Sequence, residues 1–309
     1  MVRGIVDECG LYDIIEGGQR RELWLEISPQ SFNVRVKAGI ALTQLMIFAE
    51  SAAATPAPLF APGTGPLVYD DVGTNLPLNL YKDMLILSLR VPSESSEEPE
   101  AQVDGARLRS SEGLLAGYEA VTTNEVIDMS RVDAHDPSTF FRPVYAEAGA
   151  GKMTLEKDRF YILATKEKVS IPLTVSAEMV PFSHHVGGEL HTQYCPRAPD
   201  LQLPCPADGM TPRSELRAHY AGFFDPGFGY GRAGELKGAV GVLEVRPHET
   251  ITIYDGQPIC LMEFFTNSSS PAEPYGFVDN NYQGQHGPKL AKYFAASRVE
   301  RVLAAGGTD

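Results

Sequence analysis

Two glutamates are the residues of this sequence best suited to acid–base chemistry. Glu26 and Glu244 each lie in a short apolar run, at residues 25–27 and 243–245. Burial in an apolar strand raises the proton affinity of a carboxylate, which suits a general acid or base. The alternative is a salt-bridged glutamate at the rim of an edge strand. Both residues are therefore predicted as catalytic candidates.

Metal-ligand motifs do not accompany these glutamates. Zinc deaminases use His-x-Glu and Pro-Cys-x-x-Cys motifs, and neither occurs in the sequence. A looser set of ligand types lies on one stretch and comprises His184, His185, His191, Cys195 and Cys205. Structural zinc sites use close-spaced ligand pairs, whereas nine residues separate these two cysteines. We expect free thiols and no metal bound by protein ligands.

Charge and hydropathy exclude several classes of partner. The 309 residues carry a formal net charge of −14, which opposes broad binding to nucleic acid or anionic lipid. No stretch approaches the roughly 18 apolar residues of a membrane span, and the first ten residues lack a signal-peptide layout. A cytoplasmic protein without nucleic-acid or membrane partners is expected.

The elements that must position the glutamates are predicted to be β-strands. Short apolar runs rich in Val, Ile, Phe and Tyr are separated by many of the 29 glycines and 23 prolines. This pattern is typical of an all-β fold. The length of the chain favours two domains over one large core.

The surroundings of the two glutamates form an internal repeat. Leu-Glu-x-x-Pro occurs at residues 25–29 and 243–247. Each copy continues with an alternating strand, a glycine and a second apolar strand, at residues 32–36, Gly39 and 42–48 and at residues 250–254, Gly256 and 259–265. Duplication of a β domain explains this shared order, and chance likeness of two β-meanders is the alternative.

Composition between the copies sets the predicted domain limits. Residues 51–66 are rich in Ala and Pro and residues 93–104 are acidic, whereas residues 82–91 have the pattern of a strand. The predicted parts are residues 1–50 (C-terminal part of a first domain), 51–110 (linker and loops with one strand), 111–294 (second domain with a closing arm) and 295–309 (tail).

Several stretches match one known family in order. They are WLEISPQSF (24–32), KAGIALTQLMIF (37–48), SRVDAHDPSTFFRPV (130–144), FYILATKEKVSIPLTVSAEMVPF (160–182), AHYAGFFDPGFG (218–229), DGQPICLMEFF (255–265) and PYGFVDNNYQGQHGPKLAKYF (274–294). Covering roughly two thirds of the chain, they resemble the tandem-domain dCTP deaminases of the dUTPase-like superfamily. The resemblance implies two tandem distorted β-barrels of jelly-roll type, the first lacking its opening half.

The resemblance also implies a reaction. It is the hydrolytic deamination of dCTP to dUTP and ammonia, with a glutamate in place of a metal to activate water. Glu26 is then the general base, Arg3 matches a nucleotide-binding arginine, and Gln44 matches the family's strand glutamine. Mg²⁺ is expected only with the triphosphate. Family sites lie between subunits, which implies a homotrimer or a pseudo-symmetric assembly.

Further nucleotide-binding positions follow from the resemblance in the second copy. They are Asp225 in the Asp-Pro-Gly turn and, on the closing arm, Tyr275, Tyr282, Gln283, Gln285 and Lys289. For the arm, a tyrosine ring would stack on the nucleotide and the lysine would face phosphate. An ordinary Gly- and Asn-rich tail is the alternative.

The second copy departs from the family at three points. Residues 181–187 (PFSHHVG) lack the family's serine–arginine segment and retain only Ser183, Phe223 replaces an arginine, and Leu261 replaces the glutamine found at Gln44. These departures favour a structural or relic role for Glu244. They also keep open two alternatives, a catalytically silent nucleotide-binding or assembly subunit and a dUTP diphosphatase that uses Asp225. The insertion at residues 188–215 is assigned no role.

Overall fold

The computed structural model describes residues 2–5, 22–45, 47, 67–81, 83–93, 109–110, 113–147, 149–180, 216–219, 222–277 and 281–295. Over these residues the structure consists of β-strands and one 3-10 turn, η1 (Pro137–Thr139), without an α-helix. The prediction of an all-β fold is confirmed. No helix in this part of the chain has the length and apolar character needed to cross a membrane.

The larger of two main sheets has seven strands. Its order is β10 (Phe141–Tyr145), β8 (Gly113–Ala120), β12 (Tyr161–Ser170), β16 (Ala239–Pro247) and β14 (Leu216–His219), with β4 (Leu67–Tyr69) beside β12 and β7 (Arg109–Ser110) beside β8. All of its pairs are antiparallel. Along β16, buried and half-buried residues alternate, so this strand has one face in the core and one face toward the outside.

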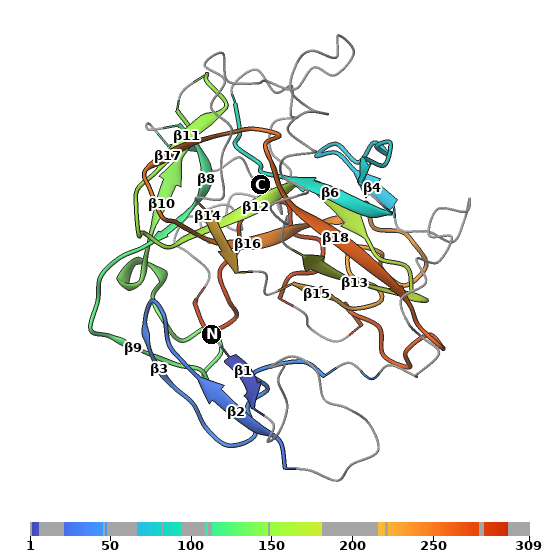
Figure 1. The fold of residues 1–309 in the computed structure, drawn as a ribbon, viewed down its shortest axis with the longest axis horizontal. Helices are drawn as coiled ribbons and strands as arrows, with labels where there is room; N and C mark the ends of the chain where they lie inside the picture. Colours follow the sequence, from blue (N-terminus) through green and yellow to red (C-terminus); the bar gives the residue numbers. More distant parts are fainter. Residues whose placement is uncertain are drawn as a thin grey trace, which may run out of the picture.

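The smaller main sheet has five strands. Its order is β15 (Phe223–Phe224), β13 (Val175–Val180), β18 (Pro258–Thr266), β6 (Met84–Ser88) and β5 (Leu80–Tyr81). The two sheets share one hydrophobic core, to which Leu163 and Leu243 contribute from the larger sheet and Leu87 and Met262 from the smaller. Figure 1 shows β6, β12, β16 and β18 together in the middle of the molecule.

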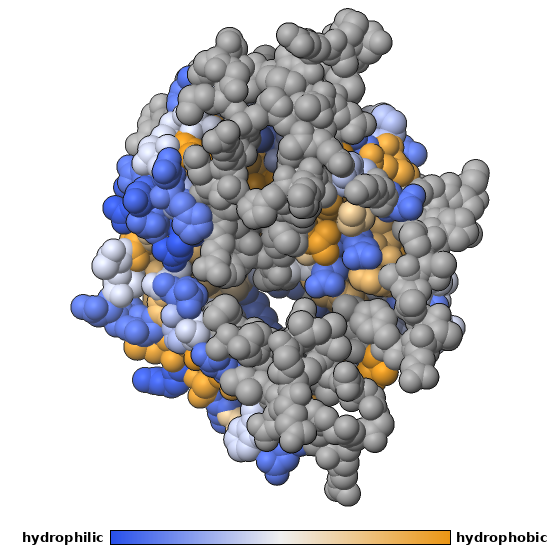
Figure 2. Space-filling model, viewed as in Figure 1, coloured by the Kyte–Doolittle hydropathy of each residue, from blue (hydrophilic) through white to orange (hydrophobic). Residues whose placement is uncertain are grey.

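Three two-stranded pairs complete the fold. They are β11 (Lys152–Leu155) with β17 (Ile251–Tyr254), β1 (Val2–Ile5) with β2 (Trp24–Ile27), and β3 (Asn33–Arg35) with β9 (Val126–Asp128). The β3–β9 pair is parallel, and it joins the first 50 residues to the second domain. Figure 1 shows β1, β2, β3 and β9 grouped at one end of the molecule. Figure 2 shows hydrophilic and hydrophobic residues side by side on the face in view.

The strands predicted near residues 82–91 and 259–265 are present as β6 and β18. The segment predicted as a linker contains more structure than the one expected strand, because β4, β5 and β6 all pair within the two main sheets. Their side chains Val68, Leu85 and Leu87 are fully buried in the shared core. The core therefore includes apolar residues that precede the predicted start of the second domain.

The strand predicted at residues 42–48 is absent from the described residues 41–45 and 47. Leu45 and Ile47 are 67% and 90% exposed, so no sheet covers this apolar run. A strand needs a neighbour for its backbone hydrogen bonds, and none lies beside these residues within the described part of the chain. The first copy of the repeat therefore forms its first two predicted strands, β2 and β3, but not the third.

Candidate functional site

Glu244 projects from the outer face of β16. Its neighbours along the strand, Leu243 and Val245, are fully buried in the core, whereas Glu244 itself is half-buried on the opposite face. No described residue forms a hydrogen bond with its carboxylate. Burial raises the pKa of Glu244 above the ordinary range of a carboxyl group. A carboxylate with a raised pKa accepts a proton more readily than an ordinary one, which suits a general base.

The segment 281–295 passes over this face of the barrel and places Tyr282 near Glu244. Burial raises the pKa of Tyr282, and the negative charge of Glu244 adds to the effect. The backbone N–H of Tyr282 donates to the hydroxyl of Tyr275, 3.3 Å away. Burial is also the main cause that raises the pKa of Tyr275 to about 12. Two tyrosines predicted on the arm therefore lie in contact.

The Asp-Pro-Gly turn that follows β15 places Asp225 at the same site. The side-chain amide of Gln44 donates to the Asp225 carboxylate at 3.2 Å. Burial raises the pKa of Asp225, and the hydrogen bond from Gln44 opposes that shift. The charge of Asp225 in turn contributes to the raised pKa of Tyr275, which places these two side chains close together. Gln44 thus connects the first 50 residues to the turn.

Gln283 holds the arm against this turn through both the oxygen and the nitrogen of its side-chain amide. The backbone N–H of Gly229 donates to Gln283 Oε1 at 2.8 Å, and Gln283 Nε2 donates to the carbonyl of Gly227 at 3.0 Å. Gly229 has a φ of +62°, and a Cβ there would lie 2.2 Å from the carbonyl oxygen of Val169. Only glycine fits so close to the strand in this conformation.

Gln285 fixes the next part of the arm to β16. Gln285 Nε2 donates to the carbonyl of Val240 at 2.7 Å, and the Val240 N–H donates back to the Gln285 carbonyl at 3.2 Å. The side-chain oxygen Oε1 of Gln285 is buried and has no hydrogen-bond partner among the described residues. A buried polar atom of this kind can accept a hydrogen bond from a bound ligand or water.

The structure thus brings together most of the residues predicted for the second copy. Contacts link Glu244 to Tyr282, Tyr282 to Tyr275, and Tyr275 to Asp225. Gln283 and Gln285 hold the arm beside these side chains. The predicted Lys289 is half-buried farther along the arm and forms no ion pair with a described residue.

Two of the three predicted residues of the first copy, Arg3 and Glu26, lie on the β1–β2 ribbon. Arg3 and Glu26 are directly opposite each other in its register. Glu26 is half-buried, whereas its neighbours Trp24 and Leu25 are exposed. The loop after β2 reaches β16 through Ser31, which accepts a hydrogen bond from Arg246 at 3.0 Å.

Several predictions concern residues that fall outside the described part of the chain. They are Ser183, the loose set of zinc-ligand types at His184, His185, His191, Cys195 and Cys205, and the insertion at 188–215. Among the described residues, no group of three or more His, Cys, Asp or Glu side chains is arranged to hold a metal ion. Leu261, which replaces the strand glutamine, is buried in a small core with Tyr81 and Ile86.

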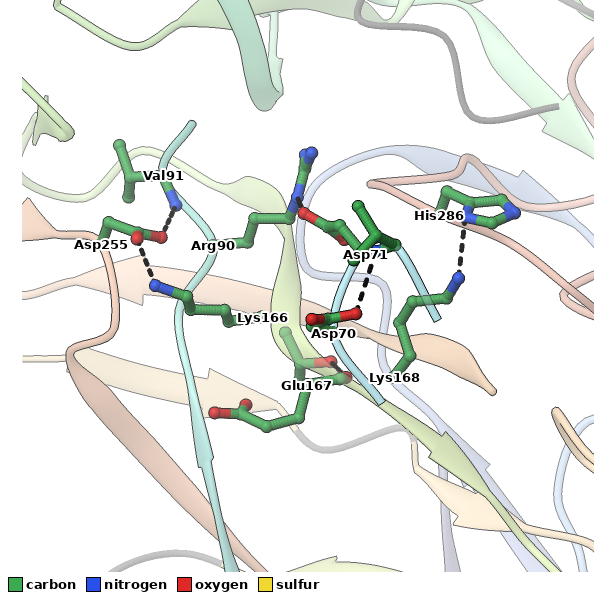
Figure 3. Close-up of polar contacts among 11 residues, drawn as sticks. Asp70, Asp71, Arg90, Val91, Lys166, Glu167, Lys168, Asp255 and His286 are labelled. Carbon is green, nitrogen blue, oxygen red and sulfur yellow. Dashed lines mark hydrogen bonds and ion pairs between the residues drawn. The ribbon is translucent and has the colours of Figure 1, made fainter. Parts of the chain in front are cut away.

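A cluster of charged residues lies beside the arm (Figure 3). The sequence did not predict it. Its centre is the run Lys166-Glu167-Lys168 in β12. Lys168 Nζ lies 3.0 Å from Nδ1 of His286, the residue that follows Gln285. Three consecutive charged residues in an otherwise apolar strand are the sequence signal that could have identified this cluster.

The structure is an antiparallel β-barrel in which a carboxylate faces a docked C-terminal segment. These two features define the class of protein. The family model described as the 2'-deoxycytidine 5'-triphosphate deaminase C-terminal domain matches residues 92–196 and 207–294. The model of the N-terminal domain of the same enzyme matches residues 1–51. The chain belongs to the 2'-deoxycytidine 5'-triphosphate deaminase family.

A solved structure agrees with this assignment. The crystal structure of 2'-deoxycytidine 5'-triphosphate deaminase from Agrobacterium tumefaciens is similar with a TM-score of 0.54 and 27% sequence identity. The similarity covers 88% of this chain and 65% of that chain. A search of curated proteins found no match.

Proposed function

We propose that this chain takes part in the hydrolytic deamination of dCTP, which yields dUTP and ammonia. The observation that carries the proposal is the environment of Glu244, a half-buried carboxylate with a raised pKa and no hydrogen bond from a described residue. Membership of the deaminase family supports dCTP as the substrate. The similar structure is longer than the matched region, so the activity remains a proposal for this chain.

The proposed chemistry requires one base and no change of oxidation state. Glu244 removes a proton from water as the oxygen attacks C4 of the cytosine, and the same carboxyl group can then deliver that proton to the ring. The proton of the new C4 hydroxyl then passes through the same carboxylate to the amino group, the C4–N bond breaks as the C4 carbonyl forms, and ammonia leaves, so water and dCTP give dUTP and ammonia. The departures of the second copy from the family pattern favoured a structural or relic role for Glu244. Its environment nevertheless supports the role of general base. Glu26 stays the candidate of the first copy.

The arm supplies the proposed contacts to the nucleotide. Tyr275 and Tyr282 lie between Asp225 and Glu244, and the unpartnered oxygen of Gln285 can accept a hydrogen bond there. Mg²⁺ would accompany the triphosphate, held by phosphate oxygens and water. A homotrimer and a cytoplasmic location remain parts of the proposal.

A second candidate function is a catalytically silent subunit that binds nucleotide. The observation that favours it is the position of Tyr282, which lies close enough to Glu244 for the two to interact electrostatically. An arm docked in this way limits the space beside the carboxylate. The silent subunit would bind dCTP without releasing ammonia.

The decisive assay follows ammonia and pyrophosphate from the purified chain with Mg²⁺ and, in separate reactions, dCTP or dUTP. Deamination releases ammonia without pyrophosphate, a diphosphatase acting on dUTP releases pyrophosphate, and a silent subunit releases neither. We expect ammonia alone. Pyrophosphate from dUTP without ammonia from dCTP would contradict the proposal and support the diphosphatase. Neither product, together with measurable dCTP binding, would contradict it and support the silent subunit.

A further inference from the structure

A second hydrophobic cluster lies on the outer face of the larger sheet, beside Glu244. It includes Ile162 of β12, which is directly opposite Glu244 in the register of β12 with β16. Val242, two residues before Glu244 and on the same face of β16, packs against the same cluster. The candidate base therefore borders a hydrophobic cluster that is separate from the main core.

Residues 126–141 form a platform within this cluster. The platform comprises β9, the turn that follows it, η1 and the first residue of β10. Its aromatic centre is the pair Phe140 and Phe141, whose residues are 2% and 5% exposed. Two segments that are far apart in the sequence meet at these two rings.

The first of these segments comes from the first fifty residues. Strand β3 pairs in parallel with β9, and the N–H of Met129 donates to the carbonyl of Arg35 at 3.0 Å. The half-buried Phe32, just before β3, meets Phe140 and Phe141 edge-on, with ring centroids 5.3 and 5.2 Å apart. Edge-to-face pairs at such distances are favourable aromatic contacts.

The second segment is the end of the arm, residues 290–295. The N–H of His135 donates to the carbonyl of Tyr293 at 3.1 Å, and the N–H of Ala295 donates to the carbonyl of His135 at 2.8 Å. Phe294 meets the same two platform rings edge-on, with centroids 5.5 and 5.4 Å apart. The first fifty residues and the arm thus share one pair of aromatic neighbours.

From Phe294 the arm leads back to the candidate base. Leu290 packs against the same cluster, and its carbonyl accepts a hydrogen bond from Nδ2 of Asn281 at 3.0 Å. Asn281 precedes Tyr282, which lies close enough to Glu244 for the two to interact electrostatically. The position of the end of the arm therefore affects the side chain beside the base.

We propose that Phe32 is a positioning residue, which holds the end of the arm through the shared rings and so keeps Tyr282 beside Glu244. The shared rings are the physical link, because a ring that loses one neighbour shifts toward the space left and packs less closely against its other neighbour. The benefit to catalysis rests on the proposed deamination, whereas the coupling of Phe32 to Phe294 does not.

The alternative is that Phe32 only fastens the first fifty residues to the platform. Its loss would then loosen β3 and leave the arm as it is in the wild type. The two interpretations differ in the behaviour of the arm, so the measurement must resolve the arm from β3.

The test is hydrogen exchange of the full chain without nucleotide, followed separately in residues 281–295, in β3 and in β13. Phe32→Leu keeps an apolar side chain but loses the ring. We expect it to raise exchange of residues 281–295 about tenfold, which is the size expected for the loss of two aromatic pairs. Exchange of β13 should stay within about twofold of the wild type. Phe32→Tyr keeps the ring and should restore the slow exchange of the arm.

Phe294→Leu gives the reciprocal measurement, because a coupling between two sites acts equally in both directions. It should speed exchange of β3 as well as of the arm. In the double variant, Phe32→Leu should add less than about twofold to the effect of Phe294→Leu on the arm, since coupled residues are not additive.

Three results would overturn the proposal. They are wild-type exchange of the arm in Phe32→Leu, a full tenfold effect of Phe32→Leu on both backgrounds, and wild-type exchange of β3 in Phe294→Leu. If Phe32→Leu does not fold, exchange of β3 in Phe294→Leu decides alone.

Ile251→Val is the control, because Ile251 of β17 packs against the main core and not against the cluster of the platform. It should leave exchange of the arm within about twofold of the wild type. Addition of dCTP separates this proposal from the proposed function, since a nucleotide that contacts the docked arm should slow its exchange. If dCTP has no such effect while Phe32→Leu still speeds exchange, the nucleotide contacts fail and the role of Phe32 in holding the arm stands.

Discussion

At the scale of single residues, the central feature is a carboxylate that is removed from water and receives no hydrogen bond from the described residues. Glu244 lies on the outer face of a core strand, and burial raises its pKa. The sequence named this residue as a candidate because Leu-Glu-x-x-Pro occurs twice, and its catalytic role stays a prediction. Its environment was not predictable, since it depends on Tyr282 from a segment nearly forty residues away.

The raised pKa predicts the shape of the pH–rate profile. A general base must be ionised to act, so deamination should fall as the pH drops through the pKa of Glu244. The shift is upward, so this acidic limb should lie above the ordinary glutamate value of about 4.3. The measurement is kcat for ammonia release between pH 4.5 and 8.5. A profile that stays flat down to the ordinary glutamate pKa contradicts this role.

At the scale of elements, two devices position the site: the glycine turn after β15 and the bulge in β12. Gly229 lets the turn lie against Val169, and its N–H is bonded to Gln283 of the arm. The bulge lies where the pairing of β12 with β16 shifts register, between Ala164 and Lys168. Glu167 and Ser88 close it, while Lys168 on the other side faces the arm. Strand β12 therefore supports both the shared core and the docked segment.

Replacement of Gly229 should destabilise the fold. In Gly229→Ala, the new methyl group would lie 2.2 Å from the Val169 carbonyl, at a φ of +62°. We expect a loss of about 2 kcal/mol or more in the free energy of unfolding, measured by urea denaturation. Gly149→Ala is the matched control, because Gly149 has a φ of +67° with no atom within 4 Å of the added methyl. Equal losses in the two variants would show that the close approach to Val169 is unimportant.

At the scale of the whole molecule, local patterns predicted the strands better than their partners. The runs that form β13 and β18 alternate or are continuously apolar, so their strand character was visible in the sequence. The insertion of β6 beside β18 was not visible, because pairing over such a separation depends on the shared core of Leu87 and Met262. The run at 42–48 had a strand pattern but has no neighbouring sheet.

The same distinction applies to the candidate site. The resemblance to the deaminases identified Asp225, Gln44 and the arm, and the structure brings these three close together. The contact of Lys168 with His286 joins residues more than one hundred positions apart, and no local motif predicts such a pair. The resemblance therefore predicted the candidate site, whereas the contact between β12 and the arm required the fold.

The most direct test of Glu244 as the general base compares two isosteric variants, Glu244→Gln and Glu26→Gln, in ammonia release from dCTP. Removal of a general base costs about 10²- to 10⁴-fold in rate, so Glu244→Gln should lose at least a hundredfold in kcat while it keeps dCTP binding. Glu249→Gln, an exposed glutamate on the next turn, is the control and should stay within twofold of the wild type. Unchanged ammonia release by Glu244→Gln, with the loss found in Glu26→Gln instead, would contradict the assignment of the base to β16.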